Sequence, residues 1–161
     1  MQFMHNAKVK FFRSLNSILG KVGTSSPISV SINLVTAYCN PVLLYGLESI
    51  RLSKANSSSI SYPFNSVFMK LFSTFDKSVV TLCQFYCGQI PLSYLVDLRM
   101  LKFCDKLSSL DSNSANILCN LFGKLEQIET ANTYGIDVSD LMYSYEYKIR
   151  QTFVEFASSL I

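Results

Sequence analysis

Apolar residues recur at steps of three and four along most of the chain, a spacing that places them on one face of a helix. The clearest case is the N-terminal segment, with apolar positions at Met4, Ala7, Phe11, Leu15, Ile18 and Val22. Gly20 and Gly23 are expected to end this helix, because glycine favours the conformation in which helices stop. Alternation typical of a strand appears nowhere at useful length. The pattern therefore predicts an all-α fold, a compact bundle of about six to seven helices.

Prolines and candidate capping serines divide the rest of the chain into further helices. A helix is expected after Pro27, which would occupy its first position, and Pro41 should break or kink it just beyond Cys39. A short helix over Val42–Leu52 should follow. Later helices are expected over Phe64–Phe75, from a Ser78 cap to Cys87, from Pro91 toward Leu110, over Ile117–Gly135, and from a Ser139 cap to the C-terminus.

Three of these helices have predicted core faces. The first face comprises Phe64, Val67, Phe68, Leu71, Phe72 and Phe75. The second comprises Ile117, Leu121, Leu125 and Ile128. The third comprises Leu141, Tyr145, Ile149, Phe153, Phe156 and Leu160.

Two polar stretches, Ser53–Ser61 and Asp111–Ser114, interrupt the apolar pattern and are interpreted as linkers. A chain of 161 residues normally makes one domain. We therefore expect a single helical domain over residues 1–161, with 53–61 and 111–114 as the points at which it could subdivide.

Composition excludes several classes of protein. With 49 % hydrophobic and only 16 % charged residues, the chain is too apolar for a disordered protein. Five scattered cysteines and no signal peptide favour free thiols in a reducing compartment, hence an intracellular protein in the cytoplasm or nucleus. The segment between Lys21 and Glu48 lacks ionisable acids and bases, but its Asn, Pro, Ser and Thr residues argue against a transmembrane helix.

The sequence contains few candidates for catalytic or metal-ligating residues. His5 is the one histidine, so a Ser/His/Asp or Cys/His arrangement is not expected. Cys83 and Cys87 share a helical face, but the remaining cysteines lack the paired spacing of a zinc site. No glycine-rich phosphate loop is present. The sequence therefore predicts no catalytic site, no metal and no cofactor.

Positive charge is concentrated in the first third of the chain. Residues 1–54 contain six basic residues and one acidic residue, whereas residues 55–161 have a balance of −2. The first helix contains no acid, and Lys10 and Arg13 point away from its apolar stripe. Together with Lys21 they could present cations to a phosphate backbone. The alternative interpretation is an ordinary solvated basic face.

Lys8 is a fourth candidate cation, but it falls near the apolar stripe, where its side chain could extend along the face. The helically spaced Phe residues also have two interpretations. They either form the core or stack on nucleobases, which would require rings exposed beside Lys or Arg. Near the C-terminus Tyr145 is expected in the core, leaving Tyr143 and Tyr147 partly exposed.

Three strings occur in an order and spacing that resemble a known family. They are AKVKFFRSLNSILGKVG at Ala7–Gly23, NPVLLYGLESIRL at Asn40–Leu52 and FNSVFMKLFSTFDKSVVTLCQFY at Phe64–Tyr86. They resemble the region just downstream of the polymerase core in reverse transcriptases of non-LTR (LINE-type) retrotransposons. The resemblance covers roughly residues 7–103, and its most specific part is the string Pro41–Glu48.

The resemblance implies thumb and post-thumb helices, which grip a template–primer duplex or element RNA. It does not transfer polymerase activity, because the fingers, the palm and the paired-Asp motif are missing from this sequence. The chain would then be a C-terminal remnant, beginning at an internal Met, that binds RNA or DNA backbones weakly through Lys10, Arg13, Lys21 and Lys8. A missing polymerase core is a further implied partner.

Two other functions fit the same residues. The chain could be a structural helical module that interacts with protein and has no role with nucleic acid, its sparse charge marking a face that docks elsewhere. Alternatively, residues 3–22 could form a membrane-surface helix, basic on one side and aromatic on the other. We rank the membrane function last, since Phe11, Leu15 and Ile18 are more simply explained as core residues.

Overall fold

The structure is a computed structural model that describes residues 2–23, 26–50, 52–109, 114, 117, 123–136 and 143–161. All regular elements among these residues are helices, so the predicted all-α fold class is confirmed. The chain divides into two compact units, Met1–Ser93 and Tyr94–Ile161, here called the N-terminal and C-terminal units. The division falls close to the start of a helix and at neither of the two polar stretches.

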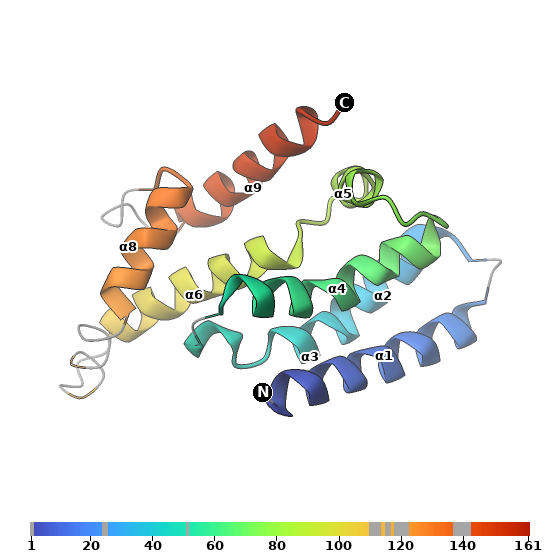
Figure 1. Cartoon of the computed structure of the whole chain (residues 1–161), viewed down its shortest axis with the longest axis horizontal. Coiled ribbons are helices and arrows are strands. Elements are labelled where there is room, and N and C mark those ends of the chain that lie inside the picture. The colour runs from blue at the N-terminus through green and yellow to red at the C-terminus, as the bar shows by residue number, and fades with distance from the viewer. Residues whose placement is uncertain are drawn as a thin grey trace. The chain divides into compact units, whose positions relative to one another are not determined.

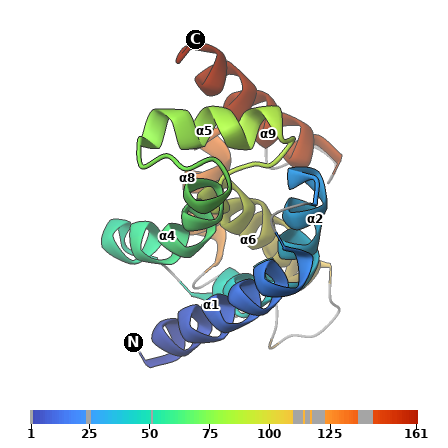
Figure 2. The same ribbon diagram turned by 90° about the vertical axis from the view of Figure 1, so that its right-hand side faces the viewer.

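The N-terminal unit is built around one long helix. Its elements are α1 (Gln2–Val22), α2 (Ile28–Tyr38), α3 (Asn40–Leu44), the 3-10 helix η1 (Leu47–Ser49), α4 (Lys54–Leu71) and α5 (Lys77–Tyr86). Helix α1 packs against α2, α3 and α4 (Figure 1). In turn, α5 packs beside α4 (Figure 2).

The predicted apolar stripe anchors α1. Ala7, Phe11 and Leu15 are buried, and Phe11 and Leu15 are completely inaccessible to solvent. The helix runs straight through Gly20, so the expectation that this glycine helps to end it is wrong. Gly23 does mark the end: it has a φ of 70°, a left-handed conformation that costs glycine little.

The segment after α2 differs from the prediction. Pro27 is the N-cap of α2 rather than its first helical residue, and Pro41 lies in the first turn of α3. The helix expected over Val42–Leu52 is broken, because Tyr45 is extended and Gly46 has a φ of 72°. A proline start and a left-handed glycine therefore confine α3 to five residues.

The polar stretch Ser53–Ser61 is not a linker: Ser53 caps α4, and the rest of the stretch forms the first turns of that helix. The Ser53 hydroxyl oxygen accepts a 3.3 Å hydrogen bond from the Asn56 backbone N–H, which caps the helix start. Ile60 is buried, and so are Phe64, Val67 and Phe68 farther along. Burial of this apolar face outweighs the low helix propensity of Ser and Asn. Of the other predicted linker, 111–114, only residue 114 is described.

The end of α4 and the start of α5 correct two further expectations. Helix α4 stops at Leu71, so Phe75 lies beyond it with 87 % of its surface exposed rather than in the core. Asp76, not Ser78, caps α5: Asp76 Oδ1 accepts hydrogen bonds from the backbone N–H groups of Ser78 and Val79 at 2.7 and 3.3 Å. A carboxylate also suits the positive end of a helix.

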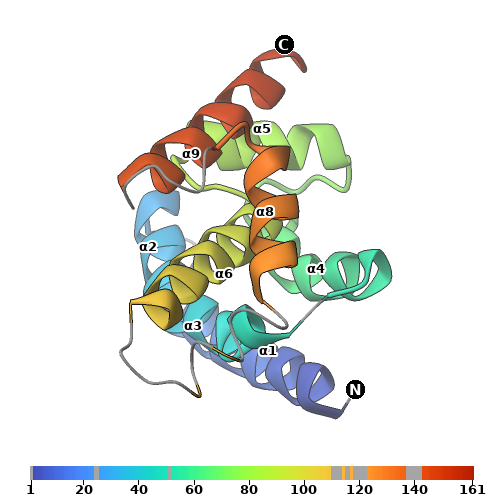
Figure 3. The same cartoon turned by 90° about the vertical axis from the view of Figure 1, so that its left-hand side faces the viewer.

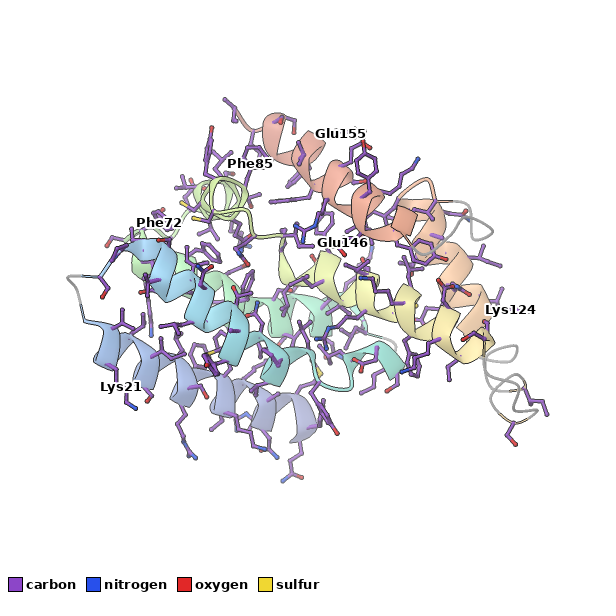
Figure 4. The ribbon with its side chains drawn as sticks, turned by 180° about the vertical axis from the view of Figure 1, so that it is seen from behind. Lys21, Phe72, Phe85, Lys124, Glu146 and Glu155 are labelled. Carbon is purple, nitrogen blue, oxygen red and sulfur yellow. The ribbon has the colours of Figure 1, made fainter. Side chains whose placement is uncertain are left out.

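The C-terminal unit contains most of α6 (Leu92–Ser108), with α8 (Lys124–Thr133) and α9 (Tyr143–Ser158). Figure 3 shows α8 crossing α6. Tyr94 of α6 makes tilted ring contacts with Tyr134 and Phe153, at centroid distances of 5.8 and 5.6 Å. An ion pair of 3.2 Å between Lys102 and Glu146 also joins α6 to α9, on the side of α9 where Figure 4 labels Glu146.

The prediction of a buried apolar stripe over Ile117–Gly135 is wrong at those of its residues that the structure describes. Leu125 is 75 % exposed and Ile128 is also exposed, whereas Gln127 and Ala131 are buried. Gln127 takes the inward position because its amide donates a 2.8 Å hydrogen bond to Asp105 Oδ1. Leu121 and the expected cap Ser139 lie outside the described residues.

The predicted face of the last helix is largely confirmed. Tyr145, Ile149 and Phe153 are buried, but Phe156 is exposed and Ala157 takes its inward place. Tyr147 is exposed as expected. The side chain of Tyr143, and Leu141 as a whole, lie outside the described part of the chain.

One segment within the described residues, Ile28–Ser49, is long enough and apolar enough to cross a membrane by length and composition alone. In the structure this segment comprises α2, α3 and η1 rather than one continuous helix. Core helices of soluble proteins satisfy the same criterion, so it does not decide between the two environments.

Candidate nucleic-acid interface

Three of the four predicted cations lie on the exposed side of α1. Lys10, Arg13 and Lys21 are all exposed. At about 100° per residue, Lys10 and Lys21 lie within about 20° of each other around the helix axis, and Arg13 lies about 60° from Lys10. Lys10 and Lys21 are separated by about 17 Å along the axis. Figure 4 shows Lys21 at the C-terminal end of α1, directed away from α2. We call these three residues the basic face.

The fourth candidate, Lys8, does not belong to this face. Its ammonium group donates a hydrogen bond to the Ser59 hydroxyl of α4, and the side chain is half-buried. The sequence placed Lys8 near the apolar stripe, and the structure explains how that position is tolerated. Lys8 joins α1 to α4, so its charge is directed away from the basic face.

A further cation approaches α1 from α4. Lys70 is exposed, and its Nζ lies 3.4 Å from Asn16 Oδ1. Sequence analysis did not single out Lys70, because it belongs to a helix whose other neighbouring positions are apolar. Only the packing of α4 on α1 brings the two side chains together.

The structure pairs no acid with the basic face in the part of the chain that it describes. Among the described residues, no carboxylate lies within salt-bridge distance of Lys10, Arg13 or Lys21, whereas Glu146 pairs with both Lys102 and Arg150 in the C-terminal unit. Helix α1 itself contains no acid. The three cations are therefore available to an anionic ligand.

The two units have net charges of opposite sign. The N-terminal unit has eight basic residues and two acidic residues, a net charge of +6. The C-terminal unit has six basic and nine acidic residues, a net charge of −3. The excess of positive charge thus coincides with the unit that carries the basic face.

Lys10 also borders a pocket between the N-terminal half of α1 and α3. The pocket has a volume of about 420 Å³ and is lined by Phe3, Asn6, Ala7, Lys10, Pro41, Val42 and Tyr45. Tyr45 is 73 % exposed and Phe3 is 43 % exposed. An exposed aromatic ring beside a lysine is the combination that base stacking requires.

Burial distinguishes the two interpretations of the helically spaced phenylalanines at several positions. Phe11, Phe64 and Phe68 are buried, so at these positions the core interpretation is correct. Sequence reasoning missed Phe3 and Tyr45. It placed Tyr45 inside a helix, but Gly46 directly after it was a signal for a chain reversal.

The structure gathers no constellation for catalysis or metal binding within its described residues. No group of three or more His, Cys, Asp and Glu side chains is close enough to hold a metal ion. Burial raises the pKa values of Cys39, Cys83 and Cys87, which favours the neutral thiol over the nucleophilic thiolate. His5 is an exposed residue of α1.

Two carboxylates of the C-terminal unit have structural roles that sequence analysis did not find. Tyr134 donates a 2.6 Å hydrogen bond to Asp97 Oδ2, and burial raises the pKa of both groups. Asp105 Oδ1 accepts from Gln127 Nε2 at 2.8 Å and from the Tyr145 hydroxyl at 3.2 Å. Burial, with Asp105 nearby, raises the pKa of Tyr145 to about 12. These hydrogen bonds join α6 to α8, to the residue that ends α8, and to α9.

Comparison with known proteins adds no relative: no protein-family model, curated protein or solved structure matches the chain.

Proposed function

We propose that this protein binds the phosphate backbone of nucleic acid through the basic face of α1. Binding is weak, because three lysine and arginine side chains form the main contact and each neutralises about one phosphate. The chain performs no catalysis of its own. The protein acts inside the cell, in the cytoplasm or nucleus.

The observation that carries this proposal is the exposure of Lys10, Arg13 and Lys21 along one side of a helix, with no carboxylate within salt-bridge distance in the described part of the chain. A basic residue that serves only for solubility is commonly interspersed with acids. Here the surrounding unit has a net charge of +6, which attracts a polyanion from a distance.

The resemblance of the three strings to the thumb region of non-LTR retrotransposon reverse transcriptases supports the same proposal. In that relationship the nucleic acid would be a template–primer duplex or element RNA, and a separate polymerase core would be a further partner. The most specific string, Pro41–Glu48, lies in the segment that forms one wall of the pocket beside Lys10.

Fluorescence anisotropy with labelled 20-nucleotide RNA, single-stranded DNA and duplex DNA at low salt tests the proposal. We expect saturable binding that is lost in the triple variant Lys10→Gln, Arg13→Gln, Lys21→Gln. The matched control, Lys106→Gln, Lys124→Gln, Lys148→Gln, removes the same charge from the C-terminal unit and should retain binding. Circular dichroism verifies that both variants fold. Absence of binding by the unmodified protein, or equal loss in both variants, contradicts the proposal.

A second candidate function is supported by exposed apolar residues on α2. Ile28, Val30 and Tyr38 are exposed, and α2 contains no charged residue. Such a surface is typical of a structural module that docks on another protein. Sedimentation distinguishes the two functions: self-association at high concentration together with no nucleic-acid binding favours the docking module.

A further inference from the structure

The lining of the pocket between α1 and α3 combines apolar surface with two polar side chains. Ala7, Pro41 and Val42 contribute aliphatic surface, whereas Phe3 and Tyr45 contribute aromatic rings. Lys10 and Asn6 supply a cation and an amide. A volume of about 420 Å³ lies within the range that small organic ligands occupy in proteins.

The backbone holds the tyrosine ring out of the core. Tyr45 ends α3 with an extended conformation, φ −62° and ψ 121°. Gly46 then reverses the chain with a positive φ, so that the buried Leu47 returns to the core while Tyr45 remains exposed. Phe3 packs at the same place: a Cβ on Gly46 would lie 3.7 Å from Phe3 Cζ. The two rings therefore belong to one surface.

The charge around this pocket selects an anionic ligand. Lys10 lines the pocket, and Arg13 follows less than one helical turn later on the exposed side of α1. A ligand with a flat ring for Tyr45 and Phe3 and an anion for Lys10 has the chemistry of a nucleotide. Base–aromatic stacking beside a basic groove is the usual way in which proteins bind single strands.

A duplex cannot supply this ligand without distortion, because its bases are already stacked and paired. A single strand can turn one base outward at little cost. We propose that the α1–α3 pocket holds one nucleotide of single-stranded nucleic acid, its base against Tyr45 and Phe3 and its phosphate on Lys10. This inference rests on the proposed function and adds a preference for single strands.

The test measures anisotropy with three labelled probes of equal length: a single strand, the same strand carrying abasic sites throughout, and a duplex. We expect Tyr45→Ala to weaken binding of the single strand about 5- to 150-fold, the range that loss of one stacked base produces. Binding of the abasic strand and the duplex should change less than twofold. Tyr45→Phe retains the ring and should bind the single strand within about twofold of the unmodified protein.

Tyr38→Ala is the matched control, since Tyr38 is also an exposed tyrosine at a helix end but does not line the pocket. It should leave all three affinities unchanged. If every probe binds and Tyr45→Ala weakens none of them, or weakens all three equally, the pocket inference fails and the backbone proposal stands. If no probe binds, both fail. Displacement of the single strand by an equal concentration of poly-glutamate, dependent on Tyr45, would overturn the nucleotide assignment in favour of an acidic peptide.

Discussion

Lys10 and Tyr45 line the same pocket, although Lys10 lies in α1, Tyr45 directly follows α3, and the whole of α2 separates them in the sequence. Their proximity depends on two local features, the packing of α1 against α3 and the chain reversal at Gly46. Neither residue is unusual alone. Together they place an exposed aromatic ring beside a lysine that has no described carboxylate partner, and they join the basic face to the pocket.

Gly46 is expected to be the most sensitive position of this arrangement. Gly46→Ala should lower the free energy of unfolding by about 1–2 kcal/mol, because a residue with a Cβ is strained in the left-handed region. The added Cβ meets only an ordinary contact at 3.7 Å, so the cost comes from the backbone. Urea denaturation followed by circular dichroism measures the change.

Gly20 provides the control for Gly46. It lies within α1, and a Cβ added there would meet no atom within 4 Å beyond its own stretch of helix. Gly20→Ala should therefore stabilise the protein by about 0.5–1 kcal/mol, because alanine loses less backbone freedom than glycine on entering a helix. Equal effects of the two substitutions would contradict the conformational explanation.

Asp97 should make the stability of the C-terminal unit depend on pH. Burial raises its pKa above the ordinary value, more than the hydrogen bond from Tyr134 lowers it. The folded state therefore favours the protonated acid, and the contribution of Asp97 falls as the pH rises from its ordinary pKa through its folded pKa. Asp97→Asn does not titrate and can still accept the Tyr134 hydrogen bond.

The measurement is the difference in unfolding free energy between Asp97→Asn and the unmodified protein, between pH 4 and pH 7. We expect this difference to shift in favour of the variant as the pH rises. A shift in the opposite direction would mean that ionised Asp97 is stabilised by its surroundings.

Asp105 should contribute more to stability than the hydroxyl of its hydrogen-bond donor Tyr145. Tyr145→Phe removes one donor and should cost about 1–2 kcal/mol. Asp105→Ala leaves both the Gln127 amide and the buried Tyr145 hydroxyl without this acceptor, and should cost about 2–4 kcal/mol. Chemical denaturation of the two variants decides the order; a larger loss in Tyr145→Phe would contradict it.

Much of the helical structure follows from the sequence where apolar spacing is strong. The stripe of α1 and the buried faces around Phe64 and Ile149 are predicted because burial of large side chains dominates helix packing. The exposure of Lys10 and Arg13 follows as well, since both point away from that stripe in any helix.

The remaining features depend on interactions between segments distant in the sequence. Ser53–Ser61 has weak helix propensity, yet burial of Ile60 and capping by Ser53 make it helical. Gln127 points inward in place of Leu125 because Asp105 of another helix accepts its hydrogen bond. The pocket also depends on contacts between distant segments, since its walls come from α1 and from α3 with the residues after it. Local periodicity carries no information about such pairings.

The salt dependence of nucleic-acid binding tests the central claim most directly. If Lys10, Arg13 and Lys21 each neutralise one phosphate, the logarithm of the association constant for a single strand should fall with the logarithm of salt concentration with a slope of about −2. Each single substitution to glutamine should reduce the slope by about 0.7. A slope near zero for the unmodified protein, or one that the three substitutions leave unchanged, would contradict backbone binding by α1.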